Sequence, residues 1–307
     1  MSTTGRDLTR RLRLLLALGA AATLVLFGAY RGVHDDTVPM ASSSTPGILA
    51  VDTAMHAMRT ANKVVSGAGA TDDTTGEFHT QISVAHQSLA RAASENVTGI
   101  EGRHTLQTVT GLIAVYSGFV ERSGKEGDDS VLRGVYLHYA GRVLSSESDG
   151  DIMDRLKDLR AEQVKKAEGQ ASFPLPLRLG WSAVLVLYVA LCAALVEAQW
   201  FARRRFRHSV HPPLLAATVL CLAVVAVLGW LTLGAHTAMN GTLDGLLQPK
   251  SADEIPGFAA HAEVKMENVG LWAALSNWVL IEGALLMALM VAGLWPRIAE
   301  YRFKASR

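Results

Sequence analysis

The chain has 307 residues, of which 50% are hydrophobic, and its formal net charge at pH 7 is +1. The hydrophobic residues gather in four long runs separated by polar stretches, which excludes an ordinary soluble protein and indicates an integral membrane protein. The nearly balanced charge provides no global field that would attract nucleic acid, so we expect no nucleic-acid partner.

The amino-terminal residues 1–13 are basic and precede the first hydrophobic run. A cleaved signal peptide is one interpretation, but the run is long for such a segment, and GVHD at 32–35 makes a poor cleavage site. We therefore predict a cytoplasmic amino terminus at 1–13 and a retained transmembrane helix at 14–33. Residues 34–47 are rich in Ser, Thr and Pro, and we expect them to form an extended spacer.

The segment 48–173 is polar, rich in alanine and free of proline between Pro46 and Pro174, which leaves long helices open to it. Apolar residues recur in it at steps of three and four, and such stripes must be buried against each other. We predict an extracytoplasmic antiparallel helical bundle that acts as a sensor domain. Its expected helices cover residues 48–66, 74–95, 101–123, 131–144 and 151–167.

Prolines lie at both junctions between this bundle and the hydrophobic runs. Pro39 and Pro46 precede the bundle, and Pro174 and Pro176 follow it, so we expect neither junction to be a continuous helix. The later segments are transmembrane helix 2 at 177–201, a basic cytoplasmic loop at 202–213, transmembrane helix 3 at 214–233, an extracytoplasmic loop at 234–270 that can lie against the bundle, transmembrane helix 4 at 271–294 and a cytoplasmic tail at 295–307.

The arginine-rich stretches at the amino terminus, the 202–213 loop and the carboxyl tail all fall on one face of this arrangement. Tryptophans near the ends of the runs fit an aromatic belt. The predicted fold class is therefore an all-α membrane protein with four transmembrane helices and an extracytoplasmic helical bundle between the first and second. The predicted location is the cell membrane, multi-pass, with both termini cytoplasmic.

Motifs for catalysis are missing from the sequence. It has no GxxxxGK[ST] phosphate loop, no GxSxG nucleophile elbow and no Cys/His cluster, and the cytoplasmic segments are too short for a kinase domain. We expect no enzymatic activity, no cofactor and no metal. Cys192 and Cys221 both lie in apolar runs, where we interpret them as small apolar fillers.

Two acidic residues lie within apolar runs. Glu197 is close to the cytoplasmic end of its run, where it can reach the interface beside Arg203 or Arg204. Glu282 lies near the middle of the fourth run, five residues after Asn277, and an intramembrane carboxylate is usually partnered or functional.

Several roles of Glu282 stay open: a coupling residue, a helix-pairing contact, part of an ion path, or a protonated acid hydrogen-bonded to Thr218, Thr232 or Asn277.

Several short motifs resemble a group of actinobacterial four-span membrane proteins. The motifs are YSGFVE at 116–121, GVYLHYA at 134–140, the basic loop at 203–207, LLAAT at 214–218 and PRIAEYR at 296–302. Compared with that group, Phe119 replaces Leu and His138 replaces Arg, and the stretch after Glu121 differs. The resemblance is therefore carried by the order of the motifs along the chain.

This resemblance implies a relay of the glutamine/glutamate-sensing type, in which the protein couples a solute-binding lipoprotein outside to a soluble serine/threonine kinase inside. The external candidates for ligand or partner binding are Tyr116, Glu121, Tyr136 and His138. The cytoplasmic candidates for partner or membrane-lipid contact are Arg203, Arg204, Arg205, Arg207, Arg297, Tyr301 and Arg302.

The predicted function is a non-enzymatic transmembrane signal relay that couples an extracytoplasmic amino-acid signal to a cytoplasmic partner. The ligand would bind directly or through a binding protein. One alternative is a small transporter or permease subunit that uses Glu282, and another is an envelope-assembly scaffold. A homodimer is also left open.

Overall fold

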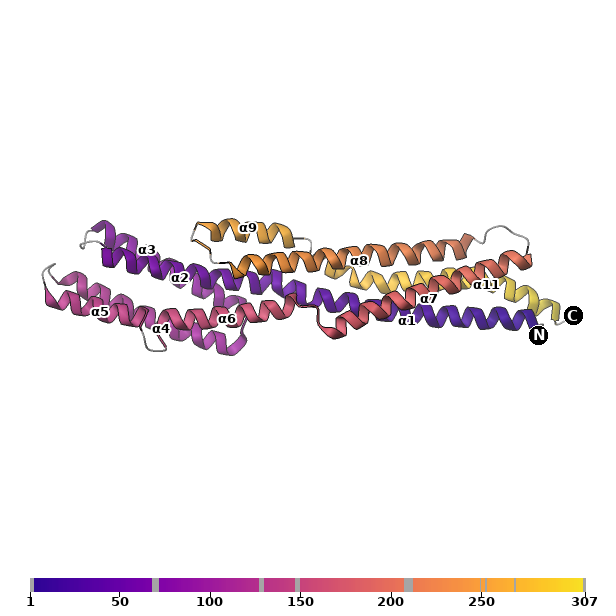
Figure 1. Ribbon diagram of the computed structural model, residues 1–307, viewed down its shortest axis with the longest axis horizontal. Coiled ribbons are helices and arrows are strands. Elements are labelled where there is room, and N and C mark those ends of the chain that lie inside the picture. Colours follow the sequence, from indigo (N-terminus) through magenta and orange to yellow (C-terminus); the bar gives the residue numbers. More distant parts are fainter. Residues whose placement is uncertain are drawn as a thin grey trace. The chain divides into compact units, whose positions relative to one another are not determined.

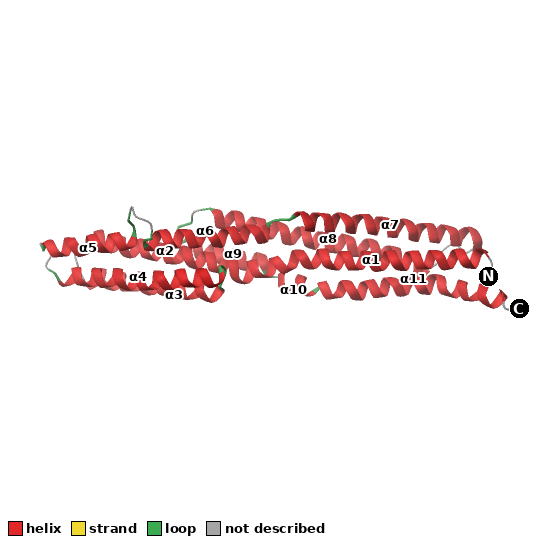
Figure 2. Cartoon of the chain, turned by 90° about the horizontal axis from the view of Figure 1, so that it is seen from below, coloured by secondary structure: helices red, strands yellow, loops and turns green. Residues whose placement is uncertain are grey.

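The computed structural model of the chain describes residues 3–67, 72–126, 130–146, 150–206, 212–248, 250–251, 253–267 and 269–305. Across these residues the regular secondary structure is helical and contains no strand (Figures 1 and 2). The all-α prediction is therefore confirmed. The helices are α1 (Thr3–Pro39), the π-helix η1 (Met40–Ser44), α2 (Thr45–Gly67), α3 (Asp72–Glu95), α4 (Gly99–Lys125), α5 (Val131–Leu144), α6 (Ile152–Ala171), α7 (Leu175–Phe206), α8 (Pro212–Leu247), α9 (Glu254–Met266), α10 (Val269–Ala274) and α11 (Ser276–Ala305).

The chain forms two compact units. The first comprises Met1–Asp36, Phe173–Thr237 and Asn268–Arg307, and the second comprises Thr37–Ser172 and Ala238–Glu267. Among the described residues, four helical stretches are long and apolar enough to cross a membrane: Arg6–Gly67, Ile152–Phe201, Pro212–Leu247 and Trp272–Pro296. Their length and composition match the four predicted spans and indicate a multi-pass membrane protein.

The first unit has its own core, built from α1, α7, α8 and α11. α1 packs closely on α11 at Gly283, where an added Cβ would overlap the side chain of Thr23. Small residues permit such close packing between membrane helices, where dispersion contacts between tightly fitted surfaces supply much of the association energy. The buried core side chains include Leu15, Leu26, Tyr30, Leu191, Leu195, Leu286 and Met290.

The second unit is the predicted helical bundle. Within it α2 packs along α3, α4 packs along α5, and α6 contacts α2 and α4. The five predicted helices correspond to α2–α6, which confirms that the apolar stripes report helices. The core of this unit includes Val51, Met58, Phe78, Leu89, Val109, Ile113, Tyr116, Ile152 and Leu156.

The predicted extended spacer at 34–47 is wrong. The backbone is helical without interruption from residue 3 to residue 67, and η1 forms a wide turn between Pro39 and Pro46. Proline has no backbone N–H, and the wider hydrogen-bond pattern of a π-helix lets the helix continue past these residues. The Ser, Thr and Pro content predicted an extended segment, yet Met40 and Thr45 are buried in the helical backbone, and the buried Ser44 donates a 2.8 Å hydrogen bond to Oε1 of Gln170 on α6.

The predicted break at the second junction is confirmed. α6 ends at Ala171, α7 begins at Leu175, and the residues between them are not helical. The backbone amide of Ser172 caps α6 by donating to the carbonyl of Glu168 at 2.9 Å. Pro174 lies in the gap, where it interrupts no helical hydrogen bond.

The segment between the third and fourth spans lies against the bundle, as expected. α8 continues to Leu247, past the end of the span predicted at 214–233, and α9 contacts α2 and η1. A small apolar cluster joins these elements, because Leu246 and Ile255 pack with Ile48 of α2 and Val164 of α6. The second unit therefore includes the end of α8 and all of α9.

The apolar residues of α5 are only partly covered. Leu132, Val135 and Tyr139 are 53%, 40% and 49% exposed, whereas Val143 packs against the core. The buried side chains of α5 are Ala140 and Leu144. The helix carries apolar residues on more than one face, so its periodicity could not show which face is covered.

Candidate functional site

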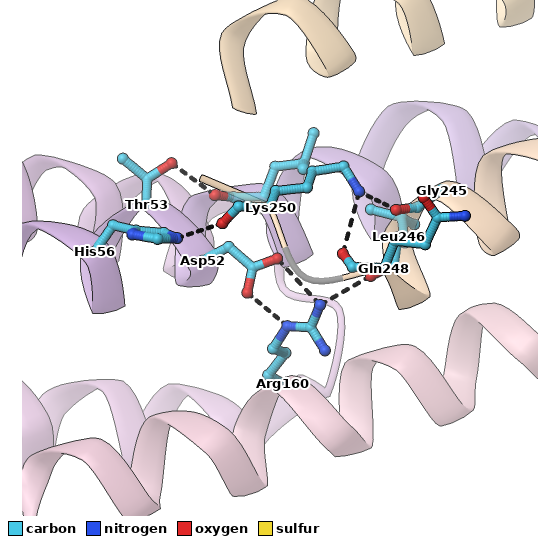
Figure 3. Close-up of polar contacts among 9 residues, drawn as sticks. Asp52, Thr53, His56, Arg160, Gly245, Leu246, Gln248 and Lys250 are labelled. Atoms are coloured by element: carbon cyan, nitrogen blue, oxygen red, sulfur yellow. Dashed lines mark hydrogen bonds and ion pairs between the residues drawn. The ribbon is translucent and has the colours of Figure 1, made fainter. Parts of the chain in front are cut away.

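Arg160 of α6 links three helices of the second unit (Figure 3). Its Nε donates to Oδ1 of Asp52 on α2 at 2.5 Å, and its Nη2 donates to Oδ2 at 3.3 Å. The same Nη2 donates to the carbonyl oxygen of Leu246 in the last turn of α8 at 2.8 Å. The guanidinium therefore neutralises a carboxylate and satisfies one of the free carbonyls at a helix C-terminus.

Lys250 follows α8 and lies beside this junction (Figure 3). Its Nζ donates to the carbonyl of Gly245 and lies 4.0 Å from the ring centroid of Phe258 on α9. Nε2 of His56 on α2 lies 2.6 Å from the carbonyl oxygen of Lys250, and because a carbonyl only accepts, this nitrogen carries the proton. Burial lowers the pKa of Lys250 below its usual value, although the nearby Asp52 opposes the shift. We call Asp52, His56, Arg160, Leu246 and Lys250 the Arg160 junction.

A separate cavity of about 300 Å³ lies among α2, α3, α4 and α5. Its walls include the apolar side chains of Val64, Val65, Phe78, Val120 and Leu137. Its volume is at the lower end of the range for small-molecule sites.

The polar residues of this cavity carry both signs of charge. Glu121 and Lys125 come from α4, Arg133 from α5 and His79 from α3. With the histidine neutral, one acid and two bases give the site a net charge of +1. This Glu121 cavity can pair the ammonium and the carboxylates of a small anionic zwitterion, because each ligand group meets an opposite charge.

The four external candidate residues are not gathered in one place. Glu121 lines the cavity, and Tyr116 is buried in the bundle core, where its hydroxyl lies 3.4 Å from Oδ1 of Asn62 and burial raises its pKa. Tyr136 is half-buried and is not among the cavity residues. His138 is exposed and makes an edge contact with the ring of Tyr139.

Sequence reasoning missed the basic side of this cavity. Lys125 follows Glu121 by four residues on one helix, and this spacing is the local signal that could have identified it. Arg133 and His79 come from other helices, so only the tertiary packing brings them to Glu121.

The intramembrane candidates lie in the first unit. Asn277 is exposed, whereas both carboxylate oxygens of Glu282 are buried and accept no hydrogen bond from any described residue. The expected hydrogen bonds from Thr218, Thr232 or Asn277 to Glu282 are therefore not formed. The hydroxyls of Thr218 and Thr232 instead donate to backbone carbonyls within α8.

Glu197 has a different partner from the one expected. Its Oε1 lies 3.1 Å from Nη2 of Arg11 on α1, and the guanidinium of Arg204 instead lies 3.7 Å from the ring centroid of Trp200. Arg203 is exposed. Arg207 lies outside the described residues, as do the side chains of Arg205, Arg297, Tyr301 and Arg302.

Comparison with known families gives a match that covers part of the chain, including most of the second unit. The model of a family described as an actinobacterial sensor domain matches residues 33–172, which include α2–α6, the Glu121 cavity, and Asp52 and Arg160. No curated protein and no solved structure matches the chain. The family match supports a sensing or signalling role, and with the four apolar helices it supports an actinobacterial-type sensor membrane protein.

Proposed function

We propose that the chain is a non-enzymatic transmembrane signal-relay protein of the glutamine/glutamate-sensing type. It couples an extracytoplasmic amino-acid signal to a cytoplasmic partner such as a serine/threonine kinase. The observation that carries this proposal is the Glu121 cavity, which lies within the segment that matches the sensor-domain family. The four apolar helices provide the link across the membrane.

The charges of the cavity favour an acidic amino acid. The ammonium group would bind Glu121, while the two carboxylates would bind Lys125 and Arg133. These side chains come from α4 and α5, and His79 adds a contact from α3. A ligand held between them would stabilise the arrangement in which the three helices are closest, and so shift the population of bundle conformations.

Binding is tested with the purified full-length protein in lipid nanodiscs, by calorimetric titration with L-glutamate, L-aspartate and L-glutamine. Glu121→Gln is expected to weaken binding at least tenfold, which is about 1.4 kcal/mol. Glu101→Gln on the same helix is the matched control, because Glu101 is exposed and outside the cavity. If Glu121→Gln binds these amino acids like the unaltered protein, the cavity is not the sensing site.

The proposal places both termini in the cytoplasm. The arginine-rich ends of the apolar helices support this orientation. Green fluorescent protein fused after residue 307 should fluoresce, and alkaline phosphatase inserted between Glu126 and Ser130 should be active. Inactive phosphatase at this position would contradict the orientation.

A binding protein is a second route for the signal, and the exposed apolar face of α5 supports it. Val131, Leu132 and Tyr139 are 82%, 53% and 49% exposed, and exposed apolar groups of this kind often mark interaction sites. Photocrosslinking from position 135 in native membranes should capture a solute-binding lipoprotein. A capture that Leu132→Glu leaves unchanged would exclude this face.

The output of the relay is the phosphorylation state of the kinase pathway. Exposed Arg203 and the neighbouring Arg204 are the described candidates for the cytoplasmic contact. Adding glutamate to cells should change phosphorylation of the kinase substrate, and Glu121→Gln should remove the response while Glu101→Gln retains it. An unchanged response in a strain that lacks the protein would contradict the relay.

A permease subunit is the alternative that one specific observation favours. The two carboxylate oxygens of Glu282 are buried without a hydrogen-bond partner among the described residues, and such intramembrane acids occur in proton pathways. Under this alternative, Glu282→Gln would abolish proton-coupled uptake while leaving the phosphorylation response intact. Under the relay, no uptake depends on Glu282.

A further inference from the structure

A second and larger cavity, of about 820 Å³, lies in the bundle unit between α3 on one side and α9 on the other. Its floor is formed by η1 and the first turns of α2. We call this cavity the α9 groove. It shares no residue with the Glu121 cavity, so the two can be occupied and altered independently.

Apolar residues make up most of the walls of the α9 groove, and several of them are alanines. Leu49 and Ala50 of α2 face Val84 of α3, and Ala259 and Met266 come from α9. Small side chains leave the groove wide, and apolar ones favour a ligand whose body is released from water on binding. This lining differs from the Glu121 cavity, where four ionisable side chains crowd a smaller volume.

Three charged side chains also line the groove. Arg91 and Glu95 lie one turn apart on α3, and Glu263 lies on α9. None of the three forms an ion pair or a side-chain hydrogen bond with another described residue. One cation and two anions give this group a net charge of −1, opposite to that of the Glu121 cavity. Their charges are thus available to a ligand that carries both signs.

We propose that the α9 groove is a second ligand site, which binds a zwitterion with an apolar body: an apolar amino acid or a short peptide of such residues. The ligand carboxylate binds Arg91, the ammonium binds Glu95 and Glu263, and the apolar side chains pack between Ala50 and Ala259. Because Arg91 and Glu263 stand on different helices, a bound ligand also holds α9 against α3.

The anchorage of α9 explains how such a ligand would influence the bundle. α9 contacts α2 and η1, its residues Ile255, Ala262 and Met266 are buried, and Lys250 lies over the ring of Phe258. Lys250 belongs to the Arg160 junction, which also includes the end of α8. A ligand that fixes α9 therefore stabilises the same group of contacts that holds the C-terminus of α8.

The test is calorimetric titration of the full-length protein in nanodiscs with L-leucine, leucyl-leucine and L-glutamate. L-Leucine or leucyl-leucine should bind. The compound with the higher affinity shows whether the natural ligand is an amino acid or a peptide. Arg91→Gln should weaken this binding at least tenfold, and Ala259→Trp, which fills the groove, should abolish it. Glu121→Gln should leave it unchanged, because Glu121 belongs to the other cavity.

Arg103→Gln is the matched control for charge, because Arg103 is exposed on α4 and does not line the groove. Far-ultraviolet circular dichroism verifies that each variant is folded. Arg91 is exposed, so the Arg91→Gln substitution should not disturb the fold. The proposal is overturned if neither leucine compound binds, if Arg103→Gln weakens binding as much as Arg91→Gln does, or if Arg91→Gln has no effect. These outcomes are independent of glutamate binding at the Glu121 cavity.

Discussion

The sulfur of Cys192 on α7 lies 3.4 Å from the sulfur of Cys221 on α8, so the two cysteines are packed against each other within the first unit. The sequence placed both in apolar runs and suggested separate filler roles. Their proximity is a property of the packing between the two helices, which no local pattern encodes.

This contact predicts that the two thiols can be crosslinked. The sulfurs must move closer to reach the disulfide bond length of about 2.05 Å, which needs only a small adjustment of the side chains. A membrane-permeable oxidant such as iodine should produce one intramolecular disulfide, detected by mass spectrometry of the digested protein. Cys192→Ser should prevent it, and a protein that stays fully reduced would contradict the packing of α7 on α8.

Removal of Arg160 should destabilise the bundle unit. Arg160→Ala leaves Asp52, whose side chain is 12% exposed, without its ion pair and frees the carbonyl of Leu246. Loss of one partner of such a pair costs about 3 kcal/mol. Thermal unfolding of the full chain in detergent, followed by circular dichroism, should show this loss.

Lys157→Ala on the same helix provides the comparison for Arg160→Ala. Lys157 pairs with Asp154 at 2.9 Å, but the two side chains are 57% and 36% exposed, so this change should cost less than about 1 kcal/mol. In the double variant Asp52→Asn/Arg160→Ala the losses should be less than additive, because the two residues share one interaction. Equal effects of Lys157→Ala and Arg160→Ala would show that the junction has no special role.

Gly283→Ala should loosen the packing of α1 against α11. The new methyl group would lie 2.2 Å from Cγ2 and 2.5 Å from Oγ1 of Thr23, so one helix must shift. Overpacking of this kind costs about 1–3 kcal/mol. The melting temperature should fall, and Thr23→Ala should restore part of it, whereas Gly229→Ala, which meets no atom within 4 Å, should be neutral.

The stability of the bundle unit should rise with pH in the alkaline range just below 10.5. Burial lowers the pKa of Lys250 from 10.5, so in this range the unfolded chain binds more protons than the folded chain, and stability increases as pH rises. Lys250→Met keeps an unbranched side chain beside Phe258 but has no group that titrates, so it should remove this part of the pH dependence. If the free energy of unfolding depends on pH equally in the variant and in the unaltered protein, this pH dependence comes from other groups.

The helices of the bundle could be predicted because apolar residues recur at helical spacing within each of them. The spacer at 34–47 could not, since its Ser, Thr and Pro residues favour irregular backbone locally. Contacts with the bundle decide the matter: η1 packs against α6, and Ser44 bonds to Gln170. Tertiary burial therefore overrides the local preference of the segment.

The candidate site was predictable only where its parts share a helix. Glu121 was identified from a motif, and Lys125 is related to it by simple spacing. Tyr116 belongs to the same motif, but the bundle core covers it. Arg133, His79 and the residues of α9 reach their cavities through the packing of separate helices, which a single sequence does not reveal.

The Arg160 junction has a consequence for how sequences of this kind diverge. Asp52 and Arg160 are 108 positions apart, yet neither can be neutralised alone without leaving a partly buried charge unpaired. Inherited substitutions at these positions should therefore occur in pairs. A chimaera that takes α6 from a distant homologue with a neutral residue at position 160 should be less stable than the parent protein, unless α2 is exchanged together with α6.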